Sequence, residues 1–159
     1  MTATGPGATT ESGRVVGIDD DRITAFGLLH EAHRRLSRTL DRSLQEQCGV
    51  GDVAFEVVLR IGRSPDGRLM MSELACQLGL TSGGVTRLVD RVSAAGLVER
   101  TACPGDRRVQ WVVLTPAGRA KLEEALTVHL ADLQRELVDR LTPAELDALT
   151  SALDKLRQP

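Results

Sequence analysis

Apolar side chains recur at helical spacing over most of the chain. Between residues 20 and 47, a predicted helix carries a stripe of leucines on one face: Leu29, Leu36, Leu40 and Leu44. This stripe is longer than one small core needs, so we expect part of it to bind a second copy of the chain. Two further leucine-rich stretches, residues 116–140 and 143–156, predict two more amphipathic helices near the C-terminus.

Residues that favour helix starts precede most of the predicted helices. Side chains of the Ser, Thr and Asp type accept hydrogen bonds from the free N–H groups of a first turn, and proline fits the first helical position. A Glu three residues after such a cap can complete a reciprocal pair of hydrogen bonds. The expected starts are Asp52 for residues 53–61, Ser72 for the next helix, Thr115 or Pro116, and Thr142 with Pro143 and Glu145.

Two short amphipathic segments in the middle of the chain meet at a tight break. The break reads Leu78-Gly79-Leu80-Thr81, and Gly79 suits the positive backbone angle of a turn between crossed helices. The second segment has a complete apolar face at i, i+3, i+4 and i+7, formed by Val85, Leu88, Val89 and Val92. This spacing is typical of a helix-turn-helix.

A predicted hairpin follows the helix-turn-helix. Gly96 is placed to end the second helix, and residues 97–101 and 109–114 read as two strands around a loop at 103–108. Leu69-Met70 could add a short strand to the same sheet. The expected fold is mainly α: a winged helix-turn-helix with a small β-hairpin wing and long N- and C-terminal helices.

This pattern divides the chain into parts. Residues 1–17 are rich in Gly, Thr, Ser and Pro and predict a disordered tail. Residues 18–159 are expected to form a single domain, with helical ends at 18–48 and 116–159 around a central unit at 52–115. The chain is 42% hydrophobic, and no apolar run approaches the length of about 18 residues that spans a bilayer. Its first residues do not resemble a signal peptide, so we expect a cytoplasmic protein.

Charge is distributed unevenly. The net charge of −2 argues at first against nucleic acid, but residues 60–110 carry eight arginines against five carboxylates. That segment is therefore +3 and the remainder is −5. A basic centre between acidic ends indicates a DNA-reading unit flanked by regions with another role.

The second helix of the motif presents polar residues opposite its apolar face. A helix fits the major groove of B-DNA, and its first turns reach the base edges. For Gly83-Gly84, the alternative to a DNA contact is a flexible turn. For Arg87 and Arg91, the alternative is an ion pair with Asp90 or Glu99. The candidate DNA contacts on this helix are Ser82, Gly83, Thr86, Arg87 and Arg91.

The hairpin tip carries two arginines beside an acid. Arg107 and Arg108 could enter a minor groove, where narrow A·T tracts concentrate negative potential. Asp106 cannot favour a phosphate, so we expect it to pair with an arginine and stabilise the wing. The combination of a helix-turn-helix, a hairpin and paired arginines is more specific than any one of these features.

At this point the chain resembles the MarR family of winged-helix regulators. The resemblance lies in residues 85–91, 96–100 and 106–118, and it extends over residues 20–156. It implies a homodimer, in which residues 18–48 and 116–159 are the dimerisation helices and 52–115 is the DNA-binding lobe. It also implies recognition helices in successive major grooves of a pseudo-palindromic operator. It assigns the major-groove contacts to Ser82, Thr86 and Arg87 and the minor-groove contact to Arg108. Most such proteins are repressors that a small ligand releases from double-stranded DNA.

Three classes of signal are open for such a regulator. A phenolic or other aromatic effector would need an apolar cleft with a few donors, although core packing explains Phe55 and a solvated face explains Arg34. The candidate cleft residues are Phe26, His30, His33, Arg34, Phe55 and Trp111. Oxidation of Cys103 near the wing arginines is an alternative signal. His30, His33 and His129 do not form a pattern typical of zinc, so no metal or other cofactor is expected.

Two other classes of function remain as alternatives to a DNA-binding regulator. The acidic total charge would suit a winged-helix module that binds proteins. An enzyme is not expected, because the sequence has no glycine-rich phosphate loop and no arrangement of a nucleophile with a base.

Overall fold

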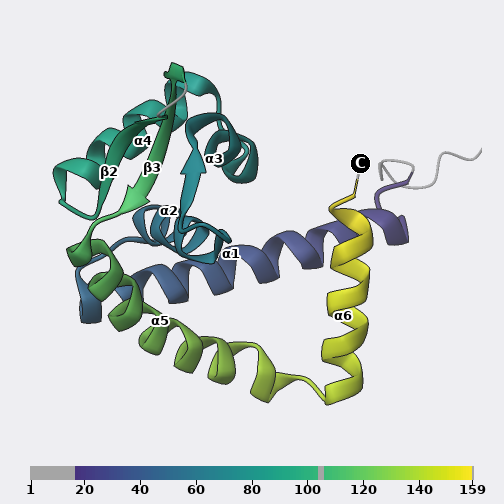
Figure 1. Cartoon of the computed structure of the whole chain (residues 1–159). Coiled ribbons are helices and arrows are strands. Elements are labelled where there is room, and N and C mark those ends of the chain that lie inside the picture. The colour runs from purple at the N-terminus through teal and green to yellow at the C-terminus, as the bar shows by residue number, and fades with distance from the viewer. Residues whose placement is uncertain (1–16, 104–105, 159) are drawn as a thin grey trace, which may run out of the picture. The chain divides into compact units, whose positions relative to one another are not determined.

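The computed structural model describes residues 17–103 and 106–158, without the side chains of residues 103–109. The fold is mainly helical with a small sheet, as predicted (Figure 1). The elements are α1 (Asp21–Cys48), α2 (Asp52–Arg63), β1 (Arg68–Met70), α3 (Met71–Leu78), α4 (Ser82–Ala94), β2 (Val98–Cys103), β3 (Asp106–Leu114), α5 (Pro116–Glu136), η1 (Val138–Arg140) and α6 (Pro143–Leu156). The predicted disordered tail lies outside the described residues up to position 16.

The chain divides into two compact units, residues 1–35 and 36–159, and the boundary falls inside α1. In the first unit, Asp20 accepts a hydrogen bond from the backbone N–H of Arg22 at 2.9 Å and pairs with its guanidinium at 2.6 Å. These contacts lower the pKa of the Asp20 carboxyl. Several large apolar side chains of this unit are exposed: Ile18, Ile23, Phe26, Leu28 and Leu29.

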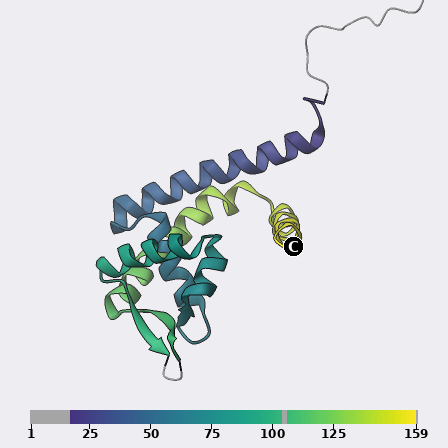
Figure 2. The ribbon, with the colours of Figure 1, turned by 90° about the horizontal axis from the view of Figure 1, so that it is seen from above.

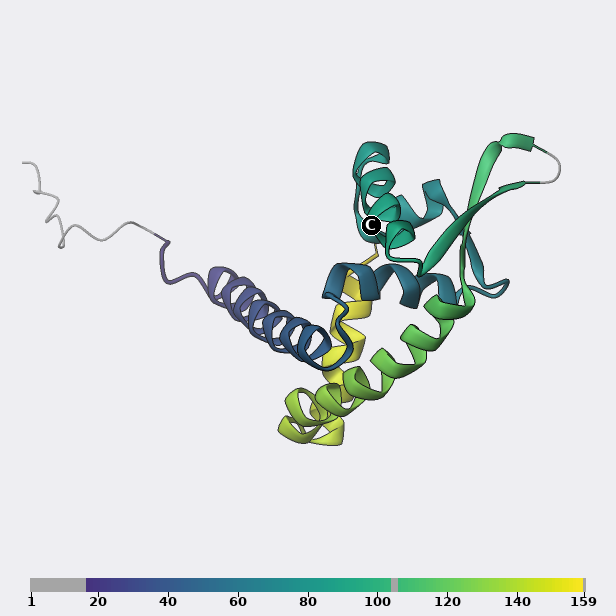
Figure 3. The same cartoon turned by 90° about the vertical axis from the view of Figure 1, so that its left-hand side faces the viewer.

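The second unit contains a three-stranded antiparallel sheet in the order β1-β3-β2. In the register, β3 residue Val112 lies between Leu69 of β1 and Arg100 of β2. Val112 and Leu69 are buried, so these two members of the row face the core. Figures 2 and 3 show β2 and β3 side by side in a hairpin that reaches away from α2, α3 and α4. The short strand predicted at Leu69-Met70 is confirmed.

One apolar core joins the helices of this unit to the sheet. It is built almost entirely from Leu, Val and Ala, as the scarcity of aromatic residues predicts, with Phe55 as its aromatic member. The core includes residues from the end of α1 and the first half of α5 as well as from the helix-turn-helix. Its largest fully buried side chains are Phe55, Leu44, Ile61, Leu74, Val57, Val58, Val85, Val89, Val98 and Val112.

The start of α5 is joined closely to the turn between α4 and β2. Thr115 is the N-cap of α5 and accepts a hydrogen bond from Gly118 N, while its own hydroxyl donates to Gly96 O at 2.6 Å. A Cβ added at Gly118 would overlap the carbonyl oxygen of Leu97. Glycine is needed at position 118 because the two backbones approach too closely for a side chain.

Two predicted helix caps are wrong. Asp52 is the first residue of α2, and its backbone N–H donates to Asp41 Oδ1 of α1 at 2.7 Å. Ser72 lies inside α3, which begins one residue earlier; Met70 N donates to Glu73 Oε2 at 2.8 Å instead. In both cases a carboxylate from another position satisfies the first turn, so the expected cap is not used.

Other helix boundaries agree with the sequence. Gly79 ends α3 with a φ of 64° and Gly96 follows α4 with a φ of 74°, as glycines at helix ends predict. Thr142 begins α6 with the expected reciprocal hydrogen bonds to Glu145. The helix predicted to reach about Arg140 is interrupted: α5 ends at Glu136, and η1 follows.

Candidate nucleic-acid interface

Helix α4 has one buried face and one open face. Val85, Leu88, Val89 and Val92 are between 0% and 4% exposed, which confirms the apolar stripe predicted from the sequence. The N-cap residue Thr81 accepts a hydrogen bond from Gly84 N at 3.2 Å. The first turn is therefore anchored at its start while its outer face remains accessible. The five residues predicted to contact DNA from this helix are all exposed: Ser82, Gly83, Thr86, Arg87 and Arg91.

The two glycines at the start of α4 have different surroundings. A Cβ at Gly84 would lie 3.3 Å from Thr81 Oγ1 and 3.6 Å from Leu80 Cβ, so position 84 has little room for a side chain. At Gly83 the nearest atom would be Arg87 Nη2, 4.0 Å away. Gly84 thus has a local packing role, whereas Gly83 leaves the surface open beside the Arg87 guanidinium.

Thr86 has one part of its hydrogen-bonding capacity already used. Its hydroxyl donates to Ser82 O at 2.8 Å, within the same helix. The hydroxyl oxygen still has an acceptor lone pair, and the methyl group remains outside. In this arrangement Thr86 can accept from an exocyclic amine of a base or contact a thymine methyl.

Sequence reasoning missed Arg100 of β2. Its Nη2 lies 2.8 Å from Asp90 Oδ1 and 3.3 Å from the backbone oxygen of Thr86. Asp90, which was weighed as a partner of Arg87 or Arg91, therefore pairs with Arg100. The available signal was strand alternation: Val98 is buried, so Arg100 two residues later faces the same side and needs an acceptor there.

The second strand of the wing begins earlier than predicted. Strand β3 starts at Asp106, which lies opposite Cys103, so the segment between the strands is shorter than the predicted loop at 103–108. The side chains of Asp106, Arg107, Arg108 and Cys103 lie outside the described residues. Their backbone places them at the far end of the hairpin from α5 (Figure 3).

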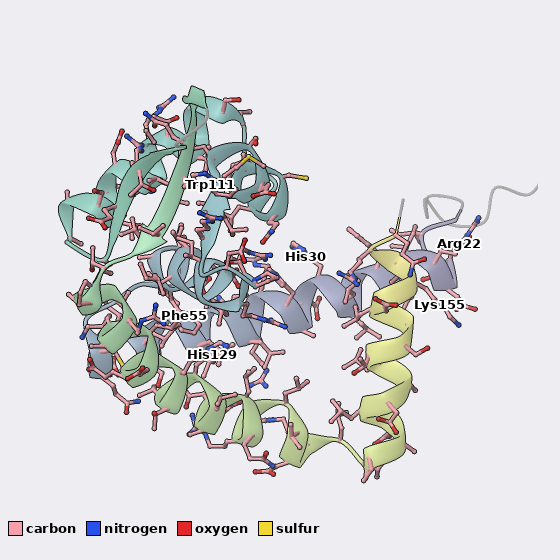
Figure 4. All side chains as sticks on the ribbon, in the orientation of Figure 1. Arg22, His30, Phe55, Trp111, His129 and Lys155 are labelled. Carbon is pink, nitrogen blue, oxygen red and sulfur yellow. The ribbon has the colours of Figure 1, made fainter. Side chains whose placement is uncertain are left out.

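The residues predicted to line a ligand cleft fall in both compact units. Phe26, His30, His33 and Arg34 belong to the first, where the rings of Phe26 and His30 are stacked at 6.3 Å. Phe55 and Trp111 belong to the second and have different neighbours there (Figure 4). Phe55 is 1% exposed and lies 4.8 Å from the His129 ring, between centroids. The Arg68 guanidinium lies 4.6 Å from the centroid of Trp111.

A polar cluster lies on the buried side of α5. Burial lowers the pKa of His129, against the opposing effect of Asp52, Asp132 and Glu56. Asp132 is 3% exposed, and its Oδ1 accepts from Arg135 at 2.6 Å. Among the described residues, neither Asp132 Oδ2 nor His129 Nδ1 has a hydrogen-bond partner.

The described residues contain no group of three or more His, Cys, Asp or Glu side chains that could hold a metal ion. Cys48 is buried and Cys76 is exposed, and neither forms a disulfide. Within the described part of the chain, no helix has the length and apolar character needed to cross a membrane.

Comparison with known proteins identifies related sequences. The MarR family model matches residues 49–109, which include the whole helix-turn-helix and the start of the hairpin. The multiple antibiotic resistance protein MarR of Salmonella typhimurium is 37% identical over 84 residues, 53% of this chain and 58% of that protein. The matched segment thus spans little more than half of that relative. The HTH-type transcriptional regulator MhqR of Bacillus subtilis is 25% identical over 134 residues, 84% of this chain and 90% of that protein.

Solved structures match over more of the chain. Sco3205, a MarR family transcriptional regulator from Streptomyces coelicolor in complex with DNA, has a TM-score of 0.82 and 29% identity. The match covers 89% of this chain and 94% of that one. A mutant of E. coli MarR complexed with operator DNA has a TM-score of 0.78 and 28% identity, over 89% and 99% of the two chains. Residues 49–109 thus match the MarR family model, and the chain has the winged-helix fold of solved MarR family transcriptional regulators.

Proposed function

We propose that this chain is a homodimeric, sequence-specific DNA-binding repressor that a small aromatic ligand releases from its operator. The observation that carries DNA binding is the division of α4 into two faces. Its apolar side chains are buried in the chain's own core, whereas Ser82, Thr86 and Arg87 on the opposite face have exposed side chains. That face begins at the helix N-terminus, where the backbone N–H groups and the helix dipole favour an anion.

The solved relatives support the same proposal. Sco3205 and the E. coli MarR mutant are both in complex with DNA, and both match nearly nine-tenths of this chain. On this basis we assign Ser82, Thr86 and Arg87 to the major groove and Arg108, with Arg107, to the adjacent minor groove. Arg91 is assigned to the phosphate backbone.

Exposed apolar residues support a homodimer. The stripe of α1 that ends in the fully buried Leu44 continues toward the N-terminus as Leu29 and Phe26, which are 40% and 70% exposed. In α6, Leu153 and Leu156 are 41% and 70% exposed. Apolar side chains of this size in a regular stripe favour burial by another protein surface, and a symmetric dimer is the commonest arrangement.

The residue types of the candidate cleft support the proposed aromatic ligand. Phe26 offers aromatic surface, and His30, His33 and Arg34 of the same helix offer donors to a phenol or carboxylate. We expect phenols and benzoate-class acids to lower the affinity for DNA in a saturable way. Arg34→Ala should shift the ligand concentration at which half of this decrease occurs, without changing the affinity of the ligand-free protein for DNA.

DNA binding is tested by selecting duplexes from a random-sequence library with the full chain. Fluorescence anisotropy of the selected duplex should show affinity that falls steeply with salt, by a slope of about −0.9 for each phosphate contact. Arg87→Ala should cost about 1–3 kcal/mol and relax the base preference, whereas Arg108→Ala should weaken binding to the flanking A·T tract. Failure to select any preferred duplex, with a salt slope near zero, would contradict the proposal and favour a protein-binding module.

The dimer is tested by sedimentation equilibrium of the full chain. A homodimer should persist at micromolar concentration, and the selected duplex should carry two half-sites about 34 Å apart. A monomer at high concentration that binds a single half-site would overturn the homodimer.

A further inference from the structure

Two elements of this chain would read DNA, and Arg100 joins them. Arg100 lies on β2, the first strand of the wing, and its side chain crosses to α4. We propose that Arg100 is a positioning residue that holds the wing at a fixed distance and angle from the recognition helix. The inference rests on the proposed function, since it concerns how the two reading elements are held together.

The geometry of the contact restrains α4 at two points. Nη2 of Arg100 is 2.8 Å from Asp90 Oδ1 and 3.3 Å from the carbonyl oxygen of Thr86. Thr86 and Asp90 are four residues apart, so they lie one turn apart on the same helix face. One guanidinium thus contacts both a side chain and the backbone of α4. Both contacts are made by Nη2, whose two N–H groups have fixed directions in the guanidinium plane, whereas the N–H groups of a lysine ammonium rotate freely.

The strand end of the contact is equally restrained. Arg100 pairs in register with Val112, whose side chain is fully buried. The base of the Arg100 side chain is therefore fixed by the sheet, and only 30% of the side chain is exposed. The sheet at one end of the side chain and the two contacts of Nη2 at the other limit the movement of the wing relative to α4.

The contact also neutralises an acid on the DNA-facing side of α4. Asp90 lies one turn beyond Thr86, and its side chain is 55% exposed. An unpaired carboxylate there would repel the phosphates of a bound duplex. Loss of Arg100 would therefore both loosen the wing and expose this charge, whereas loss of Asp90 would only loosen the wing.

The test uses the duplex that the wild-type chain selects, and a second duplex with one base pair inserted. The insertion lies between the bases whose preference Arg87→Ala relaxes and the flanking A·T tract to which Arg108→Ala weakens binding. It displaces the tract by about 3.4 Å. The wild type should bind the inserted duplex about tenfold more weakly, because its two reading elements are fixed relative to each other. Arg100→Lys, which keeps the charge, should bind the original duplex about tenfold more weakly and discriminate against the insertion about threefold or less.

Two further variants separate positioning from other roles. Asp90→Ala should discriminate against the inserted duplex as weakly as Arg100→Lys does, with a smaller loss of affinity for the original duplex. The double variant Asp90→Ala/Arg100→Ala should discriminate against the inserted duplex no less than Arg100→Ala alone. Arg60→Ala is the matched control, because Arg60 also pairs with a carboxylate, Glu56 at 2.9 Å, with similar exposure, and both residues of that pair lie within α2. It should keep the discrimination of the wild type.

Three results would overturn the inference. Arg100→Lys could discriminate like the wild type, or Asp90→Ala could leave discrimination unchanged. Arg100→Ala could also reduce the salt slope by about 0.9, which would make Arg100 a phosphate contact instead. If Arg100→Ala does not fold, Arg100→Lys and Asp90→Ala carry the test. If the wild type selects no duplex at all, the proposed function fails and these variants are not needed to show it.

Discussion

Helices α4 and α1 both carry an apolar stripe, but the chain covers only one of them completely. The four apolar residues of α4 are at most 4% exposed, whereas on α1 Phe26 is 70% and Leu29 is 40% exposed. Farther along α1, Leu44 is fully buried in the core. The chain therefore completes the surroundings of the recognition helix by itself and leaves part of α1 uncovered.

In the proposed homodimer, this difference separates a region that is stable within one chain from a region that gains stability on association. A helix whose stripe is buried within its own unit draws its stability from that unit, whereas an exposed stripe gains stability only on association. Substitutions in the two regions should consequently differ in what they change: the free energy of unfolding in one case, and the dimer dissociation constant in the other.

The two phenylalanines give the largest expected contrast. Phe55→Ala removes a ring that is 1% exposed and packs against His129, so it should lower the free energy of unfolding by about 3–5 kcal/mol. Phe26→Ala should leave the core intact and raise the dimer dissociation constant about tenfold or more. Urea unfolding and sedimentation equilibrium measure the two effects. If Phe26→Ala lowers the free energy of unfolding as much as Phe55→Ala at a concentration where the protein is monomeric, the expected contrast is wrong.

Two glycines offer the same comparison with one added methyl group. Gly118→Ala should destabilise the lobe by about 3 kcal/mol, because the new Cβ would overlap the carbonyl oxygen of Leu97. At Gly27 of α1 a Cβ would meet nothing within 4 Å, so Gly27→Ala should stabilise the helix by about 0.5–1 kcal/mol. Thermal unfolding of both variants checks this. A destabilising Gly27→Ala would place a partner's surface against that position.

A smaller effect is expected at the start of α6. Thr142 accepts from Glu145 N at 3.3 Å, and Glu145 accepts from Thr142 N at 2.8 Å. Thr142→Ala should cost about 1 kcal/mol of local stability and increase amide exchange in α6. Amides of α4 serve as the internal control, because their protection depends on a different cap, Thr81. Equal loss of protection in α4 would mean that α6 unfolds together with the lobe.

The smallest expected effect is a pH dependence at His129. Burial lowers the pKa of His129 in the folded chain, so the unfolded chain binds the proton more tightly. This residue should therefore favour the folded state above about pH 6.5 and progressively less as the pH falls through that value. His129→Phe keeps an aromatic ring against Phe55 and should remove this component from urea midpoints measured between pH 5 and 8. An unchanged pH profile in His129→Phe would assign the dependence to another group.

Local patterns were sufficient to predict most of the fold. The stripe of α4, the glycines at 79 and 96, and the Thr142 start of α6 all depend on residues a few positions apart. Periodicity alone does not decide which of the neighbouring residues His129 and Leu130 of α5 faces the core. The structure selects His129, which is half-buried, and leaves Leu130 60% exposed.

Contacts between distant positions could not be predicted in this way. Asp41 takes over the role expected of Asp52 because α1 and α2 meet across a sharp turn. Arg100 is ten residues from Asp90, and their pairing depends on how β2 lies against α4. The exposed face of α4 could be predicted as a candidate site from periodicity, but the residue that connects it to the wing could not.

The core shared by α1, the helix-turn-helix and α5 limits how this protein can be divided. Leu44 and Cys48 of α1 and Leu122 and Ala125 of α5 belong to the same apolar cluster as the recognition helix, and Lys121 of α5 donates to the Cys48 carbonyl oxygen at 2.8 Å. A fragment of residues 52–115 would expose that cluster to water on two sides. The DNA-reading unit is thus not a transplantable module, and a chimaera that exchanges it between relatives should be cut within α1 near residue 35 and beyond Ala125, so that the cluster moves as a whole.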